Sequence, residues 1–174
     1  MKKFKTLFSR EDIQKKVQEM GKQIRADYGD EPVYAMGILN GSFIFAADLI
    51  REIGSPLEVN FIKASSYGDK TVSSGDVKVW GLDGLDLTNK NVLIIEDIVD
   101  TGNTLAALRP LIEQIGPKSI KLASLLFKPS RNIVKVDIDY LGWEIDDLFV
   151  LGYGLDLAGQ YRELPDIVVN EGEA

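Results

Sequence analysis

Three carboxylates lie close together in residues 92–104, whose sequence is VLIIEDIVDTGNT. The stretch opens with an uninterrupted apolar run rich in β-branched residues, which predicts a strand buried on both faces. Glu96 and Asp97 end this strand, Asp100 follows, and the turn at 101–104 opens a helix. In open α/β sheets, ligands bind where the carboxyl end of a parallel strand meets a helix N-terminus. The stretch therefore predicts a ligand site.

The turn at 101–104 has the properties of a phosphate-binding loop. Backbone N–H groups and the helix dipole favour an anion there. Thr101 and Thr104 add hydroxyl donors, and Gly102 lets the backbone approach closely. The carboxylates would repel a bare phosphate, so they need sugar hydroxyls, a divalent cation or a proton as partners. Mg²⁺ suits such oxygen ligands and is commonly shared with substrate phosphates. The simpler alternative is a strand ending in solvated acids, followed by an ordinary Thr-capped helix.

Composition limits the chemistry further. The chain has 174 residues, of which 45% are hydrophobic and 27% charged, as is ordinary for one globular domain. It contains no cysteine and no histidine, which excludes disulfides, thiolate or histidine metal sites and histidine-based triads. Acid–base catalysis therefore falls to carboxylates, lysine or tyrosine. The formal net charge of -7 argues against a nucleic-acid-binding surface.

Strands alternating with helices run through the rest of the chain. Ser9 and Asp12 form a capping-box pattern before a helix that Gly29 and Pro32 close. Pro110 is expected to kink the helix that follows the turn. The pattern predicts further helices at 43–53 and ending at 116, and strands at 33–39, 57–63, 77–80, 92–95, 120–127, around 140, at 149–152 and at 167–169. This alternation implies an α/β fold with a mainly parallel sheet and helices on both faces.

Nothing in the sequence divides the chain or directs it to a membrane. There is no repeat, low-complexity tract or linker, so one domain over residues 1–174 is expected. The N-terminal MKKFK is followed by no apolar segment of signal type, and no apolar run is long enough to cross a bilayer. A cytoplasmic location is therefore the default expectation.

Several separated motifs carry a family resemblance. The stretch 92–104 resembles the phosphoribosyl-pyrophosphate (PRPP) signature of type I phosphoribosyltransferases. Motifs from about Val33 to Val169 are similar to those of the hypoxanthine-guanine subfamily. They are GILNGSF at 37–43, Ser66-Tyr67, FKP at 127–129, FVLGYGLD at 149–156 and Tyr161-Arg162. The resemblance implies the type I phosphoribosyltransferase fold, a mainly parallel sheet flanked by helices with a small hood from the chain termini.

The resemblance also implies an activity in purine salvage. Members of this family transfer the 5-phosphoribosyl group from PRPP to N9 of hypoxanthine or guanine, giving IMP or GMP and pyrophosphate. Mg²⁺ is the implied cofactor, and the implied partners are these small molecules and further copies of the chain in a homodimer or homotetramer. No nucleic-acid or membrane partner is expected. Because water would hydrolyse PRPP, the polar stretch 65–76 is the expected mobile active-site loop.

Residue roles follow from the same resemblance. The residue matching Asp100 is the acid/base next to purine N7, and those matching Glu96 and Asp97 lie by the ribose hydroxyls and Mg²⁺. Asp156, within the purine-binding segment, aligns with a further metal-site carboxylate. The loop implied to hold the 5′-phosphate contains Thr101, Gly102, Asn103 and Thr104. Other PRPP contacts, mainly to pyrophosphate, are implied for Leu39, Asn40, Gly41, Ser66, Tyr67 and Arg162.

Three further residues are implied to bind the purine. Lys128 donates to the 6-oxo group, Phe149 stacks on the base, and the backbone at Val150 reads the purine edge. Taken singly, Lys128 is more often a solvated lysine, Phe149 a core residue and Arg162 a surface charge. Asn40 departs from the lysine of many relatives, which removes one charge from the pyrophosphate contact. In relatives the matching turn often contains a cis non-proline peptide.

Three other functions stay open at this point. One is a phosphoribosyltransferase for xanthine, adenine or a pyrimidine, although Lys128 and the Phe149-Val150 edge favour a 6-oxopurine. Another is a non-catalytic RNA-binding regulator on the same fold, which the acidic charge balance and the intact Asp100 disfavour. The third is a phospho-acceptor receiver domain, which also places acids and a lysine at strand ends but needs no Thr-Gly-x-Thr loop.

Overall fold

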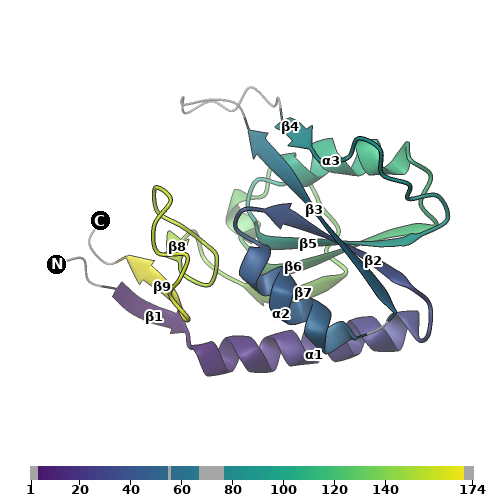
Figure 1. Ribbon diagram of the computed structural model, residues 1–174. Coiled ribbons are helices and arrows are strands. Elements are labelled where there is room, and N and C mark those ends of the chain that lie inside the picture. Colours follow the sequence, from purple (N-terminus) through teal and green to yellow (C-terminus); the bar gives the residue numbers. More distant parts are fainter. Residues whose placement is uncertain (1–3, 55, 67–76, 171–174) are drawn as a thin grey trace.

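A six-stranded sheet forms the centre of the structure, a computed structural model that describes residues 4–54, 56–66 and 77–170 (Figure 1). The strand order is β4-β3-β2-β5-β6-β7. These strands are β2 (Val33–Leu39), β3 (Leu57–Ser66), β4 (Val77–Trp80), β5 (Asn91–Val99), β6 (Ser119–Phe127) and β7 (Tyr140–Glu144). β4 runs antiparallel to β3, and every other neighbouring pair in this sheet is parallel. The predicted mainly parallel sheet is confirmed.

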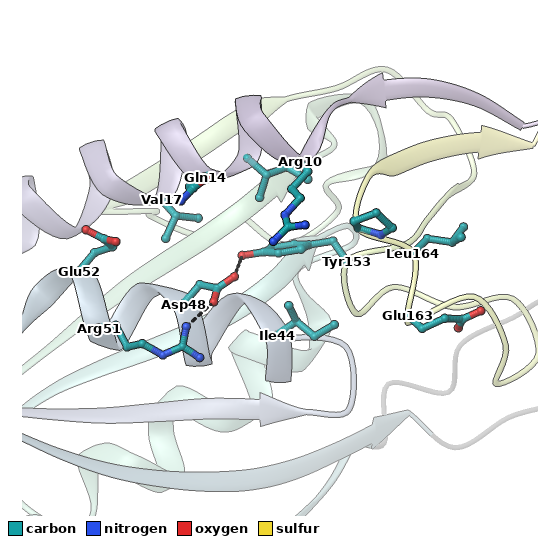
Figure 2. Close-up of a pocket in the computed structure, with 12 residues that line it drawn as sticks. Arg10, Gln14, Val17, Ile44, Asp48, Arg51, Glu52, Tyr153, Glu163 and Leu164 are labelled. Atoms are coloured by element: carbon teal, nitrogen blue, oxygen red, sulfur yellow. Dashed lines mark hydrogen bonds and ion pairs between the residues drawn. The ribbon is translucent and has the colours of Figure 1, made fainter.

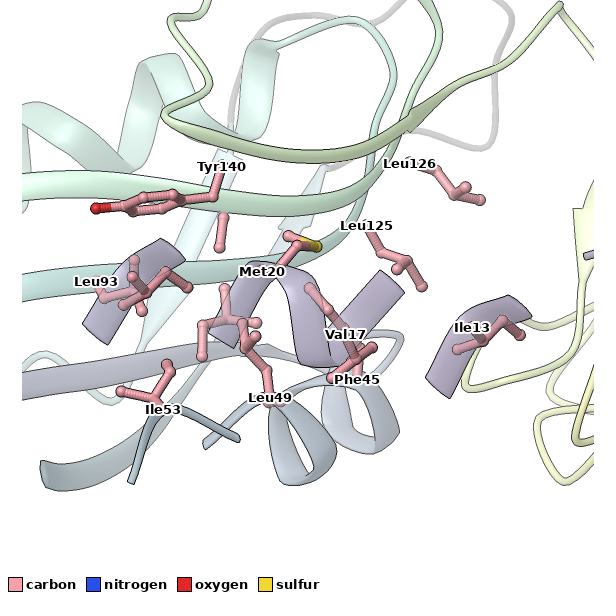
Figure 3. Packing of buried hydrophobic residues seen from close by; sticks show 14 of the residues in the cluster. Ile13, Val17, Met20, Phe45, Leu49, Ile53, Leu93, Leu125, Leu126 and Tyr140 are labelled. Atoms are coloured by element: carbon pink, nitrogen blue, oxygen red, sulfur yellow. The ribbon is translucent and has the colours of Figure 1, made fainter. Parts of the chain in front are cut away.

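Helices cover both faces of this sheet, as the alternating pattern predicted. They are α1 (Arg10–Tyr28), α2 (Phe43–Ile53) and α3 (Asn103–Glu113). α1 and α2 lie on one face and α3 on the other (Figure 1). Leu93 and Ile95 of β5 pack with α1 and α2 in the larger hydrophobic cluster, part of which Figure 3 shows, whereas Val92 and Ile94 pack on the side of α3. β5 is therefore buried on both faces, which explains its unbroken apolar run.

The first helix begins and ends as its sequence predicts. Ser9 Oγ accepts a hydrogen bond from the Asp12 N–H at 3.2 Å, and Asp12 Oδ2 accepts one from the Ser9 N–H at 3.0 Å. These two bonds complete the capping box. Gly29 ends the helix with a φ of 56°, a left-handed conformation that favours glycine. The predicted apolar stripe is buried, with Ile13, Val17, Met20, Ile24 and Tyr28 facing the core.

A small second sheet joins the two ends of the chain. It contains β1 (Phe4–Phe8), β9 (Ile167–Asn170) and β8 (Val150–Leu151) in the order β1-β9-β8. Phe4 pairs with Asn170, so the described ends of the chain lie side by side (Figure 1). This sheet is the predicted hood. β1 itself is absent from the sequence prediction, because the strand that it pairs with, β9, lies about 160 residues further along the chain.

Several strand ends differ from their predicted positions. The sequence placed the end of the central strand at Glu96 and Asp97, but β5 continues to Val99, because its pairing with β6 continues to Val99 opposite Phe127. β3 extends three residues beyond its predicted end at Lys63 and pairs there with β4. The expected mobile loop at 65–76 lies, from residue 67 onward, outside the described residues. Pro110 stands within the last turn of α3, and its kink stays a prediction.

The chain reverses its direction of travel across the sheet between β2 and β5. From β2 it passes through α2 to β3 on one side, and from β5 through α3 to β6 on the other. Such a switch point leaves a crevice at the carboxyl ends of the two strands, where open α/β sheets bind ligands. Among the described residues, no helix is long and apolar enough to cross a membrane.

Candidate active site

Two adjoining cavities lie at the carboxyl ends of β2 and β5. The first, here called the loop cavity, has a volume of about 220 Å³. Its predicted site residues are Leu39, Gly41, Glu96, Asp97, Asp100, Thr101, Gly102 and Thr104. The second, here called the hood cavity, has a volume of about 340 Å³. Its predicted site residues are Asn40, Gly41, Asp97, Asp100, Lys128, Phe149, Val150, Asp156 and Arg162. The fold thus brings segments from four parts of the chain to one place, residues 39–41, 96–104, 128 and 149–162.

The N-terminus of α3 opens the loop cavity without a capping side chain. Gly102 is the N-cap residue, with a φ of 85°, and makes no side-chain hydrogen bond to the helix. Thr101 Oγ1, one residue before the N-cap, accepts only a long bond of 3.4 Å from the Asn103 N–H, so this end differs from an ordinary Thr-capped helix, the simpler alternative. Thr101 and Thr104 line the cavity beside it. An uncapped helix start with hydroxyls nearby provides donors and a positive dipole end, which together suit a phosphate group.

The turn after β2 lies directly against the acidic end of β5. A Cβ added at Gly41 would collide with the Asp97 carboxylate, so the Asp97 side chain packs directly on the backbone of this turn. The Leu39–Asn40 peptide is cis, as the family resemblance led us to expect. On its other side, Gly41 lies against the hood, where a Cβ at Gly154 would collide with the Gly41 carbonyl oxygen. The turn therefore joins β5 to the hood at the wall of both cavities.

Glu96 is a buried carboxyl group beside a second carboxylate. Glu96 is 8% exposed and lines the loop cavity. Burial raises the pKa of Glu96 well above its usual value, and the neighbouring Asp97 charge raises it further. An ionised Glu96 would therefore be stabilised by a cation or by hydroxyl donors entering the cavity. This is the electrostatic arrangement expected beside a bound sugar or metal ion.

The hood cavity combines a buried cation with an exposed aromatic ring. Lys128, at the end of β6, is 8% exposed, and its Nζ lies 3.4 Å from Asp147 Oδ1. Phe149 is 52% exposed, although phenylalanine is usually buried. Both line the hood cavity together with Val150 at the start of β8. A planar base could stack on this ring while the lysine donates to an oxygen on its edge.

Arg162 and Asp156 form an ion pair that the sequence did not predict. Arg162 Nη2 lies 2.7 Å from Asp156 Oδ1, and Arg162 Nη1 donates to the Gly154 carbonyl at 2.5 Å. Asp156 Oδ2 accepts a further bond from the Gly159 N–H at 2.6 Å. The guanidinium therefore stands in the hood cavity in a fixed orientation, with its remaining donors available to an anion.

The carboxylates fit a metal ion that arrives with a substrate. Asp97 and Asp156 line the same cavity, and carboxylate oxygens are the ligands that Mg²⁺ prefers. In the part of the chain that the structure describes, no three His, Cys, Asp or Glu side chains form a group that could hold a metal ion by themselves. Two carboxylates suffice where substrate phosphates and water complete an octahedral shell.

Residues 128–134 brace the turn at 100–102, a contribution that the sequence analysis missed. The Lys128 N–H donates to the Val99 carbonyl, and the N–H groups of residues 133 and 134 both donate to the Thr101 carbonyl at 3.0 Å. Arg131 Nε donates to Asp100 Oδ1 at 3.2 Å. This segment includes only one short 3-10 turn and has no apolar periodicity, so its sequence carries no signal of its position.

Three predicted PRPP-contact residues are not placed in either cavity. Asn103 is the first residue of α3, and its N–H donates weakly to Thr101 Oγ1 at 3.4 Å. Ser66 is the last residue of β3, and its side chain is outside what the structure describes, as is all of Tyr67. The roles predicted for these three residues stay predictions.

A third cavity lies elsewhere and holds none of the predicted site residues. It has a volume of about 430 Å³ and lies between α1, α2 and the hood (Figure 2). Tyr153 Oη donates to Asp48 Oδ2 at 2.7 Å, and Arg51 pairs with Asp48 Oδ1 at 2.8 Å. Burial raises the pKa of Tyr153, and the bond to Asp48 raises it further. Tyr153 is thus held as a neutral donor that ties the hood to α2.

Known proteins similar to this chain identify its family. The family described as "Phosphoribosyl transferase domain" matches residues 5–157. The hypoxanthine-guanine phosphoribosyltransferase of Bacillus subtilis is 46% identical over 165 residues, which cover 95% of this chain and 92% of that protein. The chain belongs to the hypoxanthine-guanine phosphoribosyltransferase family. A second relative, the hypoxanthine phosphoribosyltransferase of Escherichia coli, is 44% identical over 90% of this chain and 89% of its own.

A solved structure of a family member has the same fold. The hypoxanthine-guanine phosphoribosyltransferase of Bacillus anthracis, crystallised with a HEPES molecule in its active site, matches this chain with a TM-score of 0.91 at 43% identity. The match covers 97% of this chain and 99% of that chain. Family membership and fold thus confirm the resemblance read from the separated sequence motifs, and this chain is an enzyme of the phosphoribosyltransferase class.

Proposed function

We propose that this enzyme transfers the 5-phosphoribosyl group from PRPP to N9 of hypoxanthine or guanine, giving IMP or GMP and pyrophosphate. One observation carries the proposal. Two cavities share Gly41, Asp97 and Asp100, so that a phosphate-type loop, a row of carboxylates and a base-type pocket follow one another along a single crevice. PRPP and a purine present the same order of groups: 5′-phosphate, ribose, then base and pyrophosphate on either side of C1′.

The phosphate and ribose of PRPP occupy the loop cavity in this proposal. The uncapped start of α3, with Thr101 and Thr104 beside it, binds the 5′-phosphate. Glu96 and Asp97 lie by the ribose hydroxyls. Their negative charge also favours the positive charge that develops on the sugar ring as the bond to pyrophosphate breaks, as in glycoside cleavage.

The purine occupies the hood cavity. Phe149 stacks on its face, Lys128 donates to its 6-oxo group, and the backbone at Val150 reads its edge. Purine N9 forms the new bond to C1′ while the C1′–oxygen bond to pyrophosphate breaks. Asp100 accepts the proton released from N7 of the purine, a general-base role that typically contributes about 10²–10⁴-fold to the rate.

Pyrophosphate leaves toward the turn after β2 and Arg162. Backbone N–H groups of the turn at 39–41 and the Arg162 guanidinium provide the donors. Asp97 and Asp156 would hold Mg²⁺ together with the substrate, and such a cation would supply positive charge to the departing pyrophosphate. Asn40 contributes no positive charge here, so Arg162 is the principal cationic side chain that the described part of this cavity offers to pyrophosphate.

Assembly and location complete the proposal. We propose a homodimer or homotetramer, because β3 and β4 leave Val59, Phe61 and Trp80 exposed, by 45%, 36% and 47%. Exposed apolar residues on adjacent strands commonly mark a protein interface. A cytoplasmic location suits an enzyme whose substrate is a phosphorylated sugar, and one domain over residues 1–174 remains the proposed organisation.

A comparison of four purines tests the proposed function. With PRPP and Mg²⁺, hypoxanthine and guanine should both be converted, because guanine's 2-amino group can donate to the backbone carbonyl at Val150. Adenine should be nearly inert, since its 6-amino group presents hydrogens to Lys128, and such mismatches reduce kcat/KM by up to about 10⁴–10⁵-fold. Xanthine would place a 2-oxo group against that carbonyl. Adenine turning over as fast as hypoxanthine would contradict the role of Lys128 and the assigned substrate.

A further inference from the structure

Four side chains of alternating charge connect the two ends of the purine pocket. Arg131 Nε donates to Asp100 Oδ1 at 3.2 Å, and Arg131 Nη1 lies 3.8 Å from Asp147 Oδ2. Asp147 Oδ1 in turn accepts from Lys128 Nζ at 3.4 Å. Asp100, Arg131, Asp147 and Lys128, here called the charge chain, therefore link the proposed general base to the proposed reader of the 6-oxo group.

The charge chain draws its members from three separate segments. Asp100 follows β5, Lys128 and Arg131 follow β6, and Asp147 lies between β7 and β8. The residues after Arg131 fix its position. The Asn132 side chain donates through Nδ2 to the Asp100 carbonyl at 3.3 Å, and the backbone N–H groups of the next two residues donate to the Thr101 carbonyl. A Cβ added at Gly102 would collide with the carbonyl of Val134 in the same segment. Arg131 is thus held next to Asp100 because residues 132–134 pack against the turn at 100–102.

We infer that Arg131 and Asp147 are positioning residues that set the separation of Asp100 and Lys128. The inference rests on the proposed function, in which these two side chains contact N7 and the 6-oxo group. Both atoms lie on one edge of the purine, so their two protein partners must stay apart by a fixed distance. Although Asp100 and Lys128 line the same cavity, the described ion pairs join them only through Arg131 and Asp147.

Electrostatics explains why intermediates of this kind are needed. A bare Asp100 carboxylate and a bare Lys128 ammonium in one cavity attract each other, and a direct ion pair would close the space for the base. Arg131 satisfies the first charge and Asp147 the second, so each stays on its own strand end. The side chains of Arg131 and Asp147 are 49% and 51% exposed, and exposed ion pairs contribute little to folding stability. Their effect should therefore be seen in catalysis.

Steady-state kinetics of Arg131→Met, Arg131→Lys and Asp147→Asn test the inference. Arg131→Met should lower kcat/KM for hypoxanthine and guanine roughly 10–100-fold, the scale of a small misplacement of reacting groups, with the KM for PRPP changed less than about twofold. Arg131→Lys keeps the charge without the planar fork and should recover part of the loss. Asp147→Asn should have a smaller effect, and adding it to Arg131→Met should cause no further loss, because both act through one chain.

Arg109→Met is the matched control. Arg109 Nε lies 3.2 Å from Glu113 Oε1 on α3, and its side chain is 47% exposed, so the same substitution breaks an equivalent pair away from the purine pocket. It should leave all kinetic parameters at wild-type values, and all variants should melt within the range of this control. If the wild type is active and Arg131→Met has the same kcat/KM for the purines as Arg109→Met, the inference is overturned. A wild type that does not convert PRPP and hypoxanthine would overturn the proposed function as well.

Discussion

Polar side chains at the two ends of the central sheet differ in whether they have hydrogen-bonding partners within the protein. At the amino ends of β5 and β6, Asn91 Nδ2 donates to Glu31 Oε2 at 2.8 Å, and Ser119 Oγ donates to Asn91 Oδ1 at 2.8 Å. Lys118 Nζ donates to the same Glu31 oxygen at 2.6 Å. Hydrogen bonds from Lys118 and Asn91 lower the pKa of Glu31. Each of these groups is satisfied within the protein.

A second network at the amino ends of β6 and β7 is similarly closed. Tyr140 Oη and Lys121 Nζ both donate to Asp27 Oδ2, at 2.8 and 3.1 Å. The hydrogen bond from Tyr140, followed by that from Lys121, lowers the pKa of Asp27. Tyr140, buried and bonded to Asp27, has its own pKa raised, mainly by burial. The arrangement holds α1 to the sheet.

The carboxyl ends of the same strands are open. There Glu96 is buried with its pKa raised, mainly by burial and then by Asp97, and it lines the loop cavity of about 220 Å³. A carboxyl whose pKa falls has found its partners inside the protein, whereas one whose pKa rises still lacks them. Glu31 and Asp27 at the amino end are therefore stabilised by partners within the fold, whereas Glu96 at the carboxyl end is buried beside a cavity that a ligand can enter.

Removal of divalent cations should have the largest effect, and only at the carboxyl end. Turnover of PRPP and hypoxanthine should vanish with EDTA and return with Mg²⁺ or Mn²⁺, because pyrophosphate needs a divalent partner to leave. The thermal midpoint of the substrate-free enzyme should not change, since the amino-end networks contain no cation other than lysine. Spectrophotometric assays with a parallel melting curve measure both. Metal-independent turnover would remove the role given to Asp97 and Asp156.

Asp100→Asn should separate catalysis from folding at the carboxyl end. The substitution changes no volume at a side chain that is 39% exposed, so the free energy of unfolding should stay near the wild-type value. Loss of the general base should lower kcat by about 10²–10⁴-fold. Asp30→Asn, at an exposed amino-end aspartate, is the control and should be fully active. A kcat near wild type would exclude Asp100 from the proton transfer.

Thr104→Val should act mainly on PRPP affinity. A hydrogen bond to a charged group contributes about 1.5–3 kcal/mol, so the KM for PRPP should rise roughly tenfold or more, with a smaller change in kcat. Thr88→Val, in the exposed turn before β5, is the isosteric control at the other end of the sheet. Equal KM values for the two variants would show that the Thr104 hydroxyl does not reach the phosphate.

Asp27→Asn should show the smallest effect, on stability and not on activity. Its partly exposed network contributes at most about 1 kcal/mol at pH 7, so urea unfolding should show a small loss with unchanged kinetics. Because the pKa of Asp27 is lower in the folded than in the unfolded chain, where it is about 3.9, this contribution is present above that pH. It is lost as the pH falls through the folded value. The difference in unfolding free energy between Asp27→Asn and the wild type should therefore shrink at pH 3. A difference that grows on acidification would contradict the lowered pKa of Asp27 in the folded protein.

Local patterns in the sequence predicted most elements of this fold. The Ser9–Asp12 capping box, the strand at 33–39 and the helix at 43–53 need only residues near one another in the chain, and the structure has them at the predicted bounds. β1, which the sequence did not predict, depends on pairing with β9. The part of β5 beyond its predicted end depends on pairing with β6. Strand ends are set by the partner strand, which no local pattern contains.

The candidate site divides in the same manner. Residue types and order alone were enough to single out Glu96, Asp97, Asp100 and the turn at 101–104, because an acidic strand end directly before a glycine turn and a helix start is typical of a ligand site. The sequence also showed that no histidine or cysteine can take part, and motif order indicated the family. Those conclusions depend only on the side-chain chemistry and order of the residues, which the sequence states directly.

Tertiary structure alone decided how these groups face one another. It paired Arg131 with Asp100 and Arg162 with Asp156. It also brought Lys128, which follows β6, next to Asp147, which follows β7. It also separated Glu96 from Glu31, two glutamates with opposite pKa shifts that look alike in the sequence. The physical reason is that burial and charge pairing depend on distances between segments far apart in the chain, and only the packed sheet fixes those distances.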